Sequence, residues 1–477
     1  MLVLPPVSMT LVAQVVTAVL TIALTGVLVA IGSSIRSKMR GAKLLAPVAG
    51  PNGRFLLGLL PEMTENLHRF FDYEMDLFKE YGERVVMPWN LLNPNMLYVS
   101  DPKDVEHMLS GNLKNYIKSD HMIACVGERK ITTRIFTTSN FKAFTEGIFQ
   151  QYALVLVDKI AANDGKCEMH TVASQYTLQT IFDIVCGVSL ASIDEDLGLQ
   201  FVESMDIVFD SIMVRAVFKP YFKYLWWCMP SEYRIRRESK VMLDLVDGII
   251  RKRLLETEAQ IVPRLDLLSL FVKRARELEA EGANALDLPT LRSVVTSSYP
   301  EQQDKILDEL KSVDATKLTF EDVKKLKYLD AFVWETLRLY PTAPGNSKQA
   351  AEDDYLPDGT FVPAGTEVLY SSYYMGRSNA KLWGDDLLVF RPERWLEMKT
   401  RPTAYEFPLF QGGPRICPGM NMALLQTKMF IAILLQKFHV QIQDGEQVQD
   451  RPYVFGASLV MKDGLPLQLT PRVTPSN

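Results

Sequence analysis

Residues 410–419 read FQGGPRICPG, a glycine- and proline-rich loop that leads into a predicted helix. Backbone N–H groups at the start of a helix stabilise a thiolate, so Cys417 is placed to act as a metal ligand or a nucleophile. Gly413 and Gly419 allow the backbone to approach a flat ligand closely. Arg415 brings a cation near the sulfur, suited to a carboxylate on that ligand. A buried, inert cysteine is the alternative for any single thiol.

The spacing of the loop and of two upstream segments adds specificity. The loop matches F-x-x-G-x-R-x-C-x-G at every fixed position, beginning with Phe410. Glu335 and Arg338 lie three residues apart on a predicted helix, so both face one side of it. Such a pair alone is common, but FRPERW follows at residues 390–395. Together the segments resemble the cytochrome P450 superfamily, and the resemblance runs along nearly the whole chain.

This resemblance implies a fold and a cofactor. The fold is mainly α with small β-sheets, and the cofactor is a thiolate-ligated haem, with Cys417 as the axial ligand of its iron. The structural triad of the family falls on Glu335, Arg338 and Arg394. The resemblance also implies further cofactor-binding residues. Four of them belong to the loop: Phe410, Gly413, Arg415 and Gly419. The other two are Lys348, at the family's propionate-binding position, and Arg129, in a W-x-x-x-R motif in which Cys125 replaces the Trp. The alternatives are a solvated strand end for Lys348 and a surface helix charge for Arg129.

Residues 348–365, KQAAEDDYLPDGTFVPAG, indicate a branch of the superfamily. With residues 370–377 they are similar to the plant and fungal branch that hydroxylates the terminal carbon of fatty acids and alkanes. The resemblance then implies a lipophilic substrate, a long-chain fatty acid, and electrons from an NADPH–cytochrome P450 reductase. Val454, Phe455 and Leu459 are candidates for lining a substrate channel, with ordinary core packing as the alternative.

Two family segments are missing. The A-G-x-D-T motif that delivers protons to bound dioxygen is absent between residues 287–295 and 299–303, which resemble its flanks. Even a fully helical segment from Leu291 to Tyr299 rises only about 14 Å. The loop before residues 125–129 is also short. Catalytic residues therefore stay unassigned, and the two gaps resemble dropped segments.

These gaps leave three functions open. The first is a monooxygenase. The second is a haem-thiolate isomerase or dehydratase of lipid hydroperoxides, which needs no reductase. The third is an inactive remnant or a mis-spliced form.

The N-terminal residues predict a membrane anchor. No side chain up to Ile35 is charged, and the apolar run 9–31 would rise about 34 Å as a helix, enough for a bilayer core of about 30 Å. Basic residues at positions 36, 38, 40 and 43 then predict a cytosolic body. A cleaved signal peptide and a buried core helix are the alternatives. We expect an anchor at residues 1–35, a basic, proline-rich hinge at 36–61, a haem domain at 62–477, contact with membrane lipid, and a single-pass location in the endoplasmic reticulum membrane.

The amino-acid composition excludes several classes of protein and disfavours two kinds of binding site. Of 477 residues, 47% are hydrophobic and 23% charged, which are globular proportions and exclude a disordered or collagen-like chain. The net charge of −5 gives no basic domain, so nucleic acid is not an expected partner. Five cysteines form no C-x-x-C pair and the five histidines are scattered, which disfavours a zinc site.

Periodicity predicts the secondary structure. We expect a hairpin of residues 84–87 and 96–100, a strand at 367–370 after a turn at 357–359, and a strand pair of 458–461 with 467–469. Helical spacing covers residues 101–109, 175–188, 239–256, 265–279, 320–340 and 420–438. The proline-rich residues 45–51 should end any preceding helix.

Overall fold

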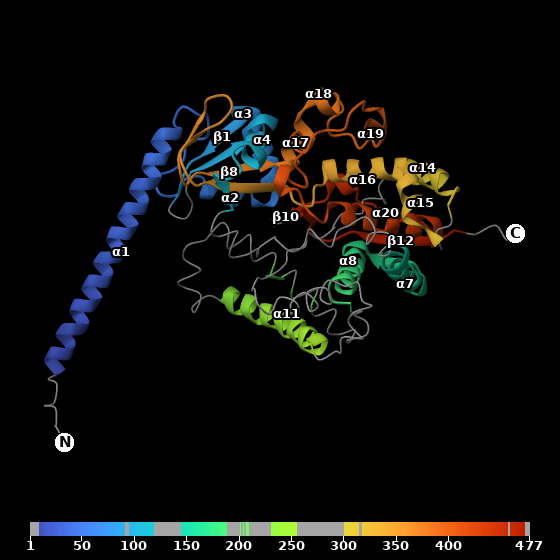
Figure 1. Cartoon of the computed structure of the whole chain (residues 1–477), viewed down its shortest axis with the longest axis horizontal. Coiled ribbons are helices and arrows are strands. Elements are labelled where there is room, and N and C mark those ends of the chain that lie inside the picture. The colour runs from blue at the N-terminus through green and yellow to red at the C-terminus, as the bar shows by residue number, and fades with distance from the viewer. Residues whose placement is uncertain are drawn as a thin grey trace, which may run out of the picture.

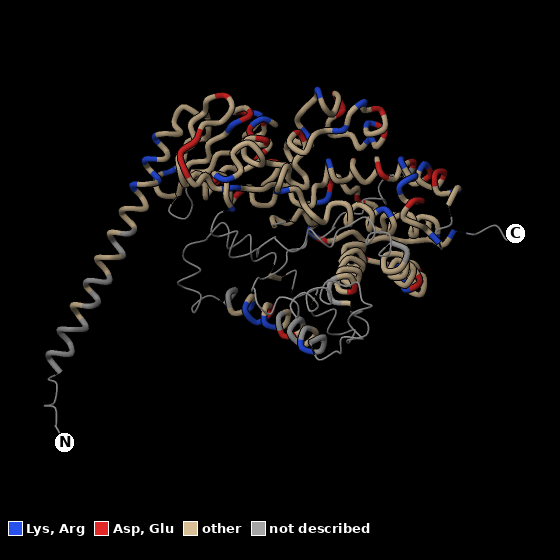
Figure 2. The backbone as a smooth tube through the Cα atoms, viewed as in Figure 1, with Lys and Arg blue, Asp and Glu red and all other residues tan. Residues whose placement is uncertain are grey.

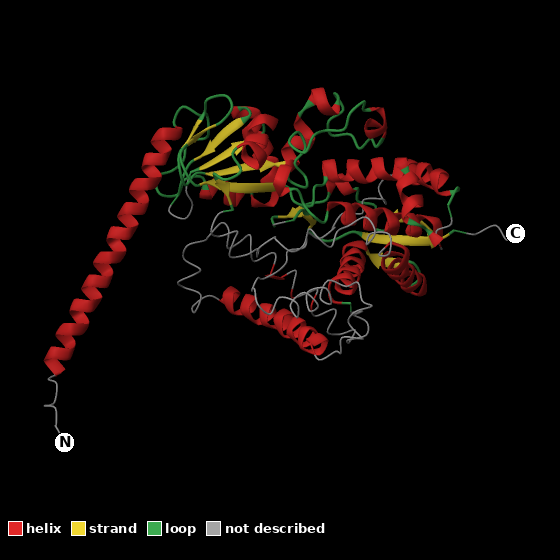
Figure 3. Cartoon of the chain, viewed as in Figure 1, coloured by secondary structure: helices red, strands yellow, loops and turns green. Residues whose placement is uncertain are grey.

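The computed structural model describes residues 9–90, 95–118, 145–187, 230–254, 300–313, 317–456 and 458–472, with single positions 201, 204, 207 and 208. Helices dominate these residues and the sheets are small, as Figure 3 shows. The α-helices are α1 (Met9–Leu45), α2 (Leu60–Glu65), α3 (Phe70–Tyr81), α4 (Pro102–Glu106), α7 (Gln150–Ala162), α8 (Met169–Cys186), α11 (Pro230–Leu254), α14 (Pro300–Leu310), α15 (Phe320–Lys325), α16 (Lys327–Leu339), α17 (Ser372–Ser378), α18 (Ala380–Trp383), α19 (Glu393–Glu397) and α20 (Met420–Lys437).

Within the described residues the strands form four separate sheets, and the largest of them lies near the C-terminal end of α1 (Figure 1). They are β1 (Arg84–Met87), β2 (Met96–Val99), β3 (Tyr116–Ile117), β4 (Lys166–Glu168), β5 (Gly345–Ala350), β6 (Asp354–Tyr355), β7 (Phe361–Val362), β8 (Glu367–Ser371), β9 (Phe438–Ile442), β10 (Tyr453–Val454), β11 (Val460–Met461) and β12 (Pro466–Pro471). The largest sheet has the order β1-β2-β8-β5-β3, and β2 pairs with β8 in parallel. The predicted hairpin of β1 and β2 is confirmed.

The core of the helical part is built around α20. Residues 429–435 of this helix are at most 1% exposed, so it is covered on all sides, as expected for a helix that is apolar around its whole circumference. Helices α7, α14 and α16 pack against it. The helix begins at Met420, directly after the cysteine loop, so the buried helix fixes where that loop ends.

Two predicted elements differ from the observed ones. The predicted pairing of 458–461 with 467–469 is wrong, because β11 pairs with β10 and β12 pairs with β9 and β4. The alternation of apolar and polar residues identifies a strand but does not identify the strand that pairs with it. Here Leu467 and Leu469 are fully buried and pack into the core around α20. The predicted helix 320–340 is divided at Leu326, where a carboxylate from α14, Glu309, accepts the backbone N–H of Tyr328 at 3.0 Å and so caps a new helix. The predicted helix 265–279 lies outside the described residues.

The N-terminal helix α1 extends away from the body of the protein, and its C-terminal end lies beside the sheet that contains β1 and β8 (Figure 1). Figure 2 shows Lys and Arg along its last turns. There Lys38 Nζ donates to the carbonyl of Asn90 at 2.9 Å, and Asn95 Nδ2 donates to the Lys38 carbonyl at 2.9 Å. The helix ends at Leu45, as predicted, and Val86 N–H then donates to the Ala49 carbonyl at 2.9 Å. Within the described ranges, no helix combines the length and apolarity that crossing a membrane requires.

A buried carboxyl joins α3 to the end of β8. Glu74 is 7% exposed, and its carboxylate accepts a hydrogen bond of 2.6 Å from Ser371 Oγ. Burial raises the pKa of Glu74 to about 7, and the Ser371 hydrogen bond opposes that rise only in part. The folded protein therefore binds a proton here at pH values where the unfolded chain has released it.

This carboxyl makes stability depend on pH. Because the folded-state pKa lies above the unfolded one, we expect stability to fall as the pH rises from about 5 to about 7. Glu74→Gln, which cannot ionise, should reduce this fall and raise the melting temperature at pH 8. Thermal melts in detergent at several pH values measure both effects. Glu80→Gln, on the exposed side of α3, is the control and should retain the wild-type pH dependence; an equal slope in Glu74→Gln would contradict the assignment.

Candidate functional site

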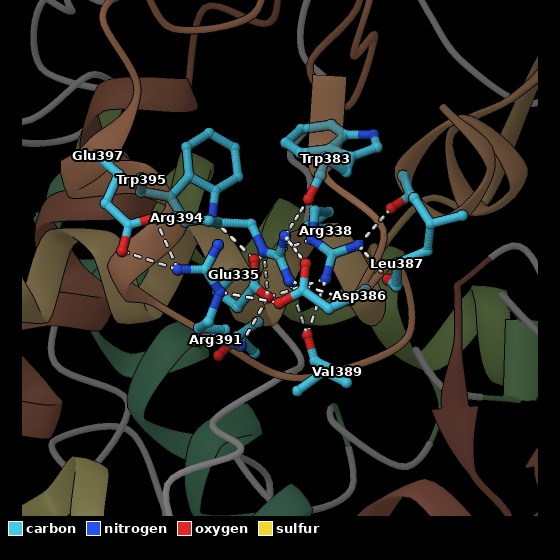
Figure 4. A network of polar contacts seen from close by, with 12 residues as sticks. Glu335, Arg338, Trp383, Asp386, Leu387, Val389, Arg391, Arg394, Trp395 and Glu397 are labelled. Carbon is cyan, nitrogen blue, oxygen red and sulfur yellow. Dashed lines mark hydrogen bonds and ion pairs between the residues drawn. The ribbon is translucent and has the colours of Figure 1, made fainter. Parts of the chain in front are cut away.

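The buried carboxylate of Glu335 lies at the centre of a network of polar contacts (Figure 4). Its Oε1 accepts from Arg338 Nη2 at 2.8 Å, Arg394 Nε at 2.9 Å and the Arg391 backbone N–H at 2.8 Å. Its Oε2 accepts from Arg338 Nε at 2.8 Å and Trp395 Nε1 at 2.9 Å. The side chains of Glu335, Arg338 and Arg394 are at most 2% exposed. The structure thus brings the three residues of the predicted triad together.

The two guanidinium groups extend this network into the backbone. Arg338 Nη1 donates to the carbonyls of Gly376 at 2.6 Å and Leu387 at 2.7 Å. Arg394 Nη1 donates to Asp386 Oδ1 at 3.0 Å, and its Nη2 donates to the Val389 carbonyl at 3.0 Å. The network therefore ties α16 and α19 to α17 and to the loop between α18 and α19 (Figure 4).

Aromatic side chains connect the network to the cysteine loop. Trp395, which donates to Glu335, lies against Trp334 with ring centroids 5.5 Å apart. Trp334 in turn meets the ring of Phe410 edge to face at 6.1 Å. Such aromatic pairs add to the free energy gained from burial. The loop is thus anchored at its first residue by a chain of rings that starts at the buried carboxylate.

The cysteine loop contains a sharp turn, and its Cys417 lies just before the start of α20. Gln411 and Gly413 have φ of +59° and +56°, and a Cβ on Gly413 would lie 3.1 Å from the Leu109 carbonyl oxygen. The backbone N–H of Cys417 donates to the Phe410 carbonyl at 2.8 Å, which closes the turn. Cys417 carries a half-buried thiol at the N-terminal end of α20, where the helix dipole favours a thiolate.

Two cationic side chains predicted to hold the cofactor, Arg415 and Lys348, are at least partly buried. Arg415 Nη2 donates to the Leu113 carbonyl at 3.0 Å. Tyr370 on β8 is 1% exposed, its hydroxyl is buried, and the positive charge of Arg415 acts on it. Lys348 on β5 is 2% exposed and donates from Nζ to Asn346 Oδ1 at 2.6 Å, which excludes a solvated strand end. Arg129 lies outside the described residues.

These residues fit a haem. The Cys417 thiol would ligate the iron, while Arg415 and Lys348 supply cations for the propionate carboxylates. The Tyr370 hydroxyl has no hydrogen-bond partner among the described residues, which suits a cavity wall that a polar cofactor group completes. The missing proton-delivery motif falls in residues 287–303, of which the structure describes only those from Pro300 onward.

Sequence reasoning missed several supporting residues. The sequence assigned no role to Trp334, Asp386 or Tyr370, although Trp334 directly precedes Glu335. Adjacent residues of a helix point in different directions, so the position of Trp334 beside the E-x-x-R pair did not predict its contacts. Asp386 and Tyr370 carry no comparable pattern and depend on tertiary contacts.

A cavity of about 570 Å³ lies elsewhere, between α3, α17 and the β10–β11 hairpin. Leu459, a candidate channel-lining residue, is among the side chains around it. Leu459 and Phe455 pack on the Phe70–Phe71 cluster, whereas Val454 is 38% exposed. These contacts support an ordinary packing role for Phe455 and Leu459.

Comparisons with known proteins agree with the site. The family model described as Cytochrome P450 matches residues 48–297 and 289–468. The two matches overlap at residues 289–297, within the segment where the proton-delivery motif is missing. Cytochrome P450 94B1 from Arabidopsis thaliana is 30% identical, covering 85% of this chain and 89% of the relative. Cytochrome P450 CYP94D108 from Paris polyphylla is 28% identical, and the match covers 86% of this chain and 90% of the relative. Noroxomaritidine synthase 1 from Narcissus pseudonarcissus is 26% identical, and the match covers 91% of this chain and 94% of the relative.

The buried network predicts a large loss of stability in Glu335→Ala. Removing the carboxylate leaves the buried Arg338 guanidinium without its counter-charge and leaves Arg394 with Asp386 alone, and breaking such a network costs about 3–5 kcal/mol. Urea unfolding of the full chain in detergent measures this loss. Glu397→Ala removes an exposed carboxylate bonded to Arg391 in the same region and should cost no more than about 1 kcal/mol. A stable Glu335→Ala protein with an altered product profile would contradict a structural role.

Proposed function

The chain belongs to the cytochrome P450 family, a class of haem-thiolate monooxygenases, and we propose that its substrate is a long-chain fatty acid hydroxylated at or near the terminal carbon. The observation that supports haem-thiolate chemistry is the Cys417 thiol just before the N-terminal end of α20, in a loop that Phe410 and the buried network hold in place. That arrangement supports Cys417 as the axial ligand.

When bound, a haem would supply the chemistry that activates dioxygen and transfers one of its oxygen atoms to a C–H bond. The residues of this chain contribute binding and orientation. The helix dipole at α20 favours the Cys417 thiolate, and the hydrogen bond from the Cys417 N–H to the Phe410 carbonyl fixes the backbone that carries it. The charge of Arg415 would hold a carboxylate of the cofactor. We propose an NADPH–cytochrome P450 reductase as the source of electrons, by analogy with the family.

The substrate class rests on the segment 348–365 and its EDD-x-LPDG pattern. In the structure this segment contributes β5 and the β6–β7 turn, and Lys348 stands at its beginning. The support for the substrate class is the likeness of this segment to the fatty-acid-hydroxylating branch, and the geometry of a substrate site plays no part in it.

The axial ligand is tested by Cys417→Ser. We expect the reduced wild-type protein with carbon monoxide to show the red-shifted Soret band of thiolate ligation, and the variant to lose it. Cys167→Ser is the matched control: burial and the charge of Glu168 raise the pKa of the Cys167 thiol to about 12, so it stays protonated. Loss of the band in Cys167→Ser alone would overturn the assignment.

The reaction is tested with purified chain, reductase, NADPH and a panel of fatty acids. Because no A-G-x-D-T motif stands between residues 287 and 303, we expect NADPH consumption to yield mainly hydrogen peroxide and little terminal hydroxylation. A version with a distal segment inserted there should hydroxylate efficiently. No binding of any fatty acid by that version would remove the substrate proposal. Turnover of a lipid hydroperoxide without NADPH would favour the isomerase instead.

We also propose that the uncharged run 9–31 anchors the chain in the endoplasmic reticulum membrane with its body in the cytosol. The support is the run itself and the basic residues that follow it. Membranes from cells expressing the full chain should retain it in the pellet after alkaline carbonate extraction. A version without residues 1–35 is the control and should be released more readily; equal release of the full chain would contradict the anchor.

A further inference from the structure

The hydroxyl of Tyr370 is an unsatisfied polar group beside the proposed cofactor site. Tyr370 is 1% exposed, and its hydroxyl has no hydrogen-bond partner in the part of the chain that the structure describes. Buried hydroxyls normally have a partner, because leaving one without it costs free energy. Two other buried tyrosines have such a partner: Tyr176 donates to the Phe149 carbonyl at 3.2 Å, and Tyr373 donates to Asp72 at 2.8 Å.

The β-sheet places Tyr370 on the same face as Lys348. In the antiparallel pairing of β5 with β8, Asn346 lies directly opposite Tyr370, and Lys348 lies opposite Val368. Residues two apart in a strand share a face, so these side chains emerge on one side of the sheet. The bond from Lys348 Nζ to Asn346 Oδ1 at 2.6 Å agrees with this placement.

The cysteine loop also lies close to Tyr370. Tyr370 and Leu109 belong to one packed cluster, and Tyr405 packs against it. Gly413 lies against both neighbours, since a Cβ there would be 3.1 Å from the Leu109 carbonyl oxygen and 3.1 Å from the Tyr405 hydroxyl. Arg415, two residues further along, is close enough for its charge to act on the Tyr370 hydroxyl. Tyr370 therefore lies between β5 and the loop that carries Cys417.

We propose that Tyr370 is a positioning residue for the cofactor, whose O–H donates a hydrogen bond to a haem propionate carboxylate held by Arg415. The assignment rests on the proposed haem site. A carboxylate is the acceptor that the arrangement requires, because the neighbouring guanidinium only donates hydrogen bonds. Burial raises the pKa of Tyr370 far above its usual value despite the opposing charge of Arg415, so the hydroxyl keeps its proton and donates it.

The test is Tyr370→Phe in the full chain, which removes only the hydroxyl. Two quantities are measured: the rate of haem transfer to an excess of apomyoglobin, and the melting temperature of the haem-free protein. We expect haem release to become about tenfold faster, the loss typical of a hydrogen bond to a charged group. The haem-free variant should melt at the wild-type temperature or above it, because an unsatisfied hydroxyl has been removed. A purely structural role predicts the opposite, lower stability without haem.

Tyr98→Phe is the matched control. Tyr98 is buried in β2 of the same sheet, but it packs in a different cluster, and the charged groups that act on it are the carboxylates of Glu74 and Glu367. Haem release from Tyr98→Phe should equal that of the wild type. Wild-type release from Tyr370→Phe, or equal acceleration in both variants, would overturn the assignment while leaving the haem site intact. A wild-type chain that takes up no haem would instead overturn the proposed function and this assignment with it.

Discussion

The carboxylate of Glu335, buried between the guanidinium groups of Arg338 and Arg394, is the interaction on which the rest of the structure depends. Removing three charged groups from water is costly, and only close pairing with complete hydrogen bonding offsets that cost. Here five donors satisfy the carboxylate, and the guanidinium groups donate to backbone carbonyls of α17 and of the loop between α18 and α19. The loop has no regular structure of its own, so these contacts hold it in place.

The same network explains why the cysteine loop has a defined geometry. Its aromatic extension through Trp395 and Trp334 ends on Phe410, and the Phe410 carbonyl accepts the N–H of Cys417. The other end of the loop is fixed by α20, whose residues 429–435 form the centre of the core. The thiol is therefore positioned from two sides by buried elements, which is the condition for presenting one sulfur atom to a rigid, planar cofactor.

Local sequence signals predicted most of the helices and strands. Which strands pair with each other, and where a long helix is interrupted, could be learned only from the folded structure. The hairpin of β1 and β2 and the helix after Cys417 follow from alternation, turn residues and helical spacing over a few positions. The partner of β12 does not follow, because a short strand with two buried leucines suits several sheets equally well. The break at Leu326 depends on Glu309, a residue 17 positions earlier, which no local pattern connects to it.

By itself the sequence determined the family and the three residues of the buried network, and it predicted Cys417 as the sulfur ligand, because fixed spacings of chemically distinctive residues encode all of them. It also showed that a proton-delivery motif is missing. Only the tertiary structure decided that Lys348 is buried, that Trp334 links the network to the loop, and that the Tyr370 hydroxyl lies near Arg415 without a partner among the described residues. The reason is physical: burial and hydrogen-bond satisfaction are properties of segments far apart in the chain, and they exist only after those segments have packed together.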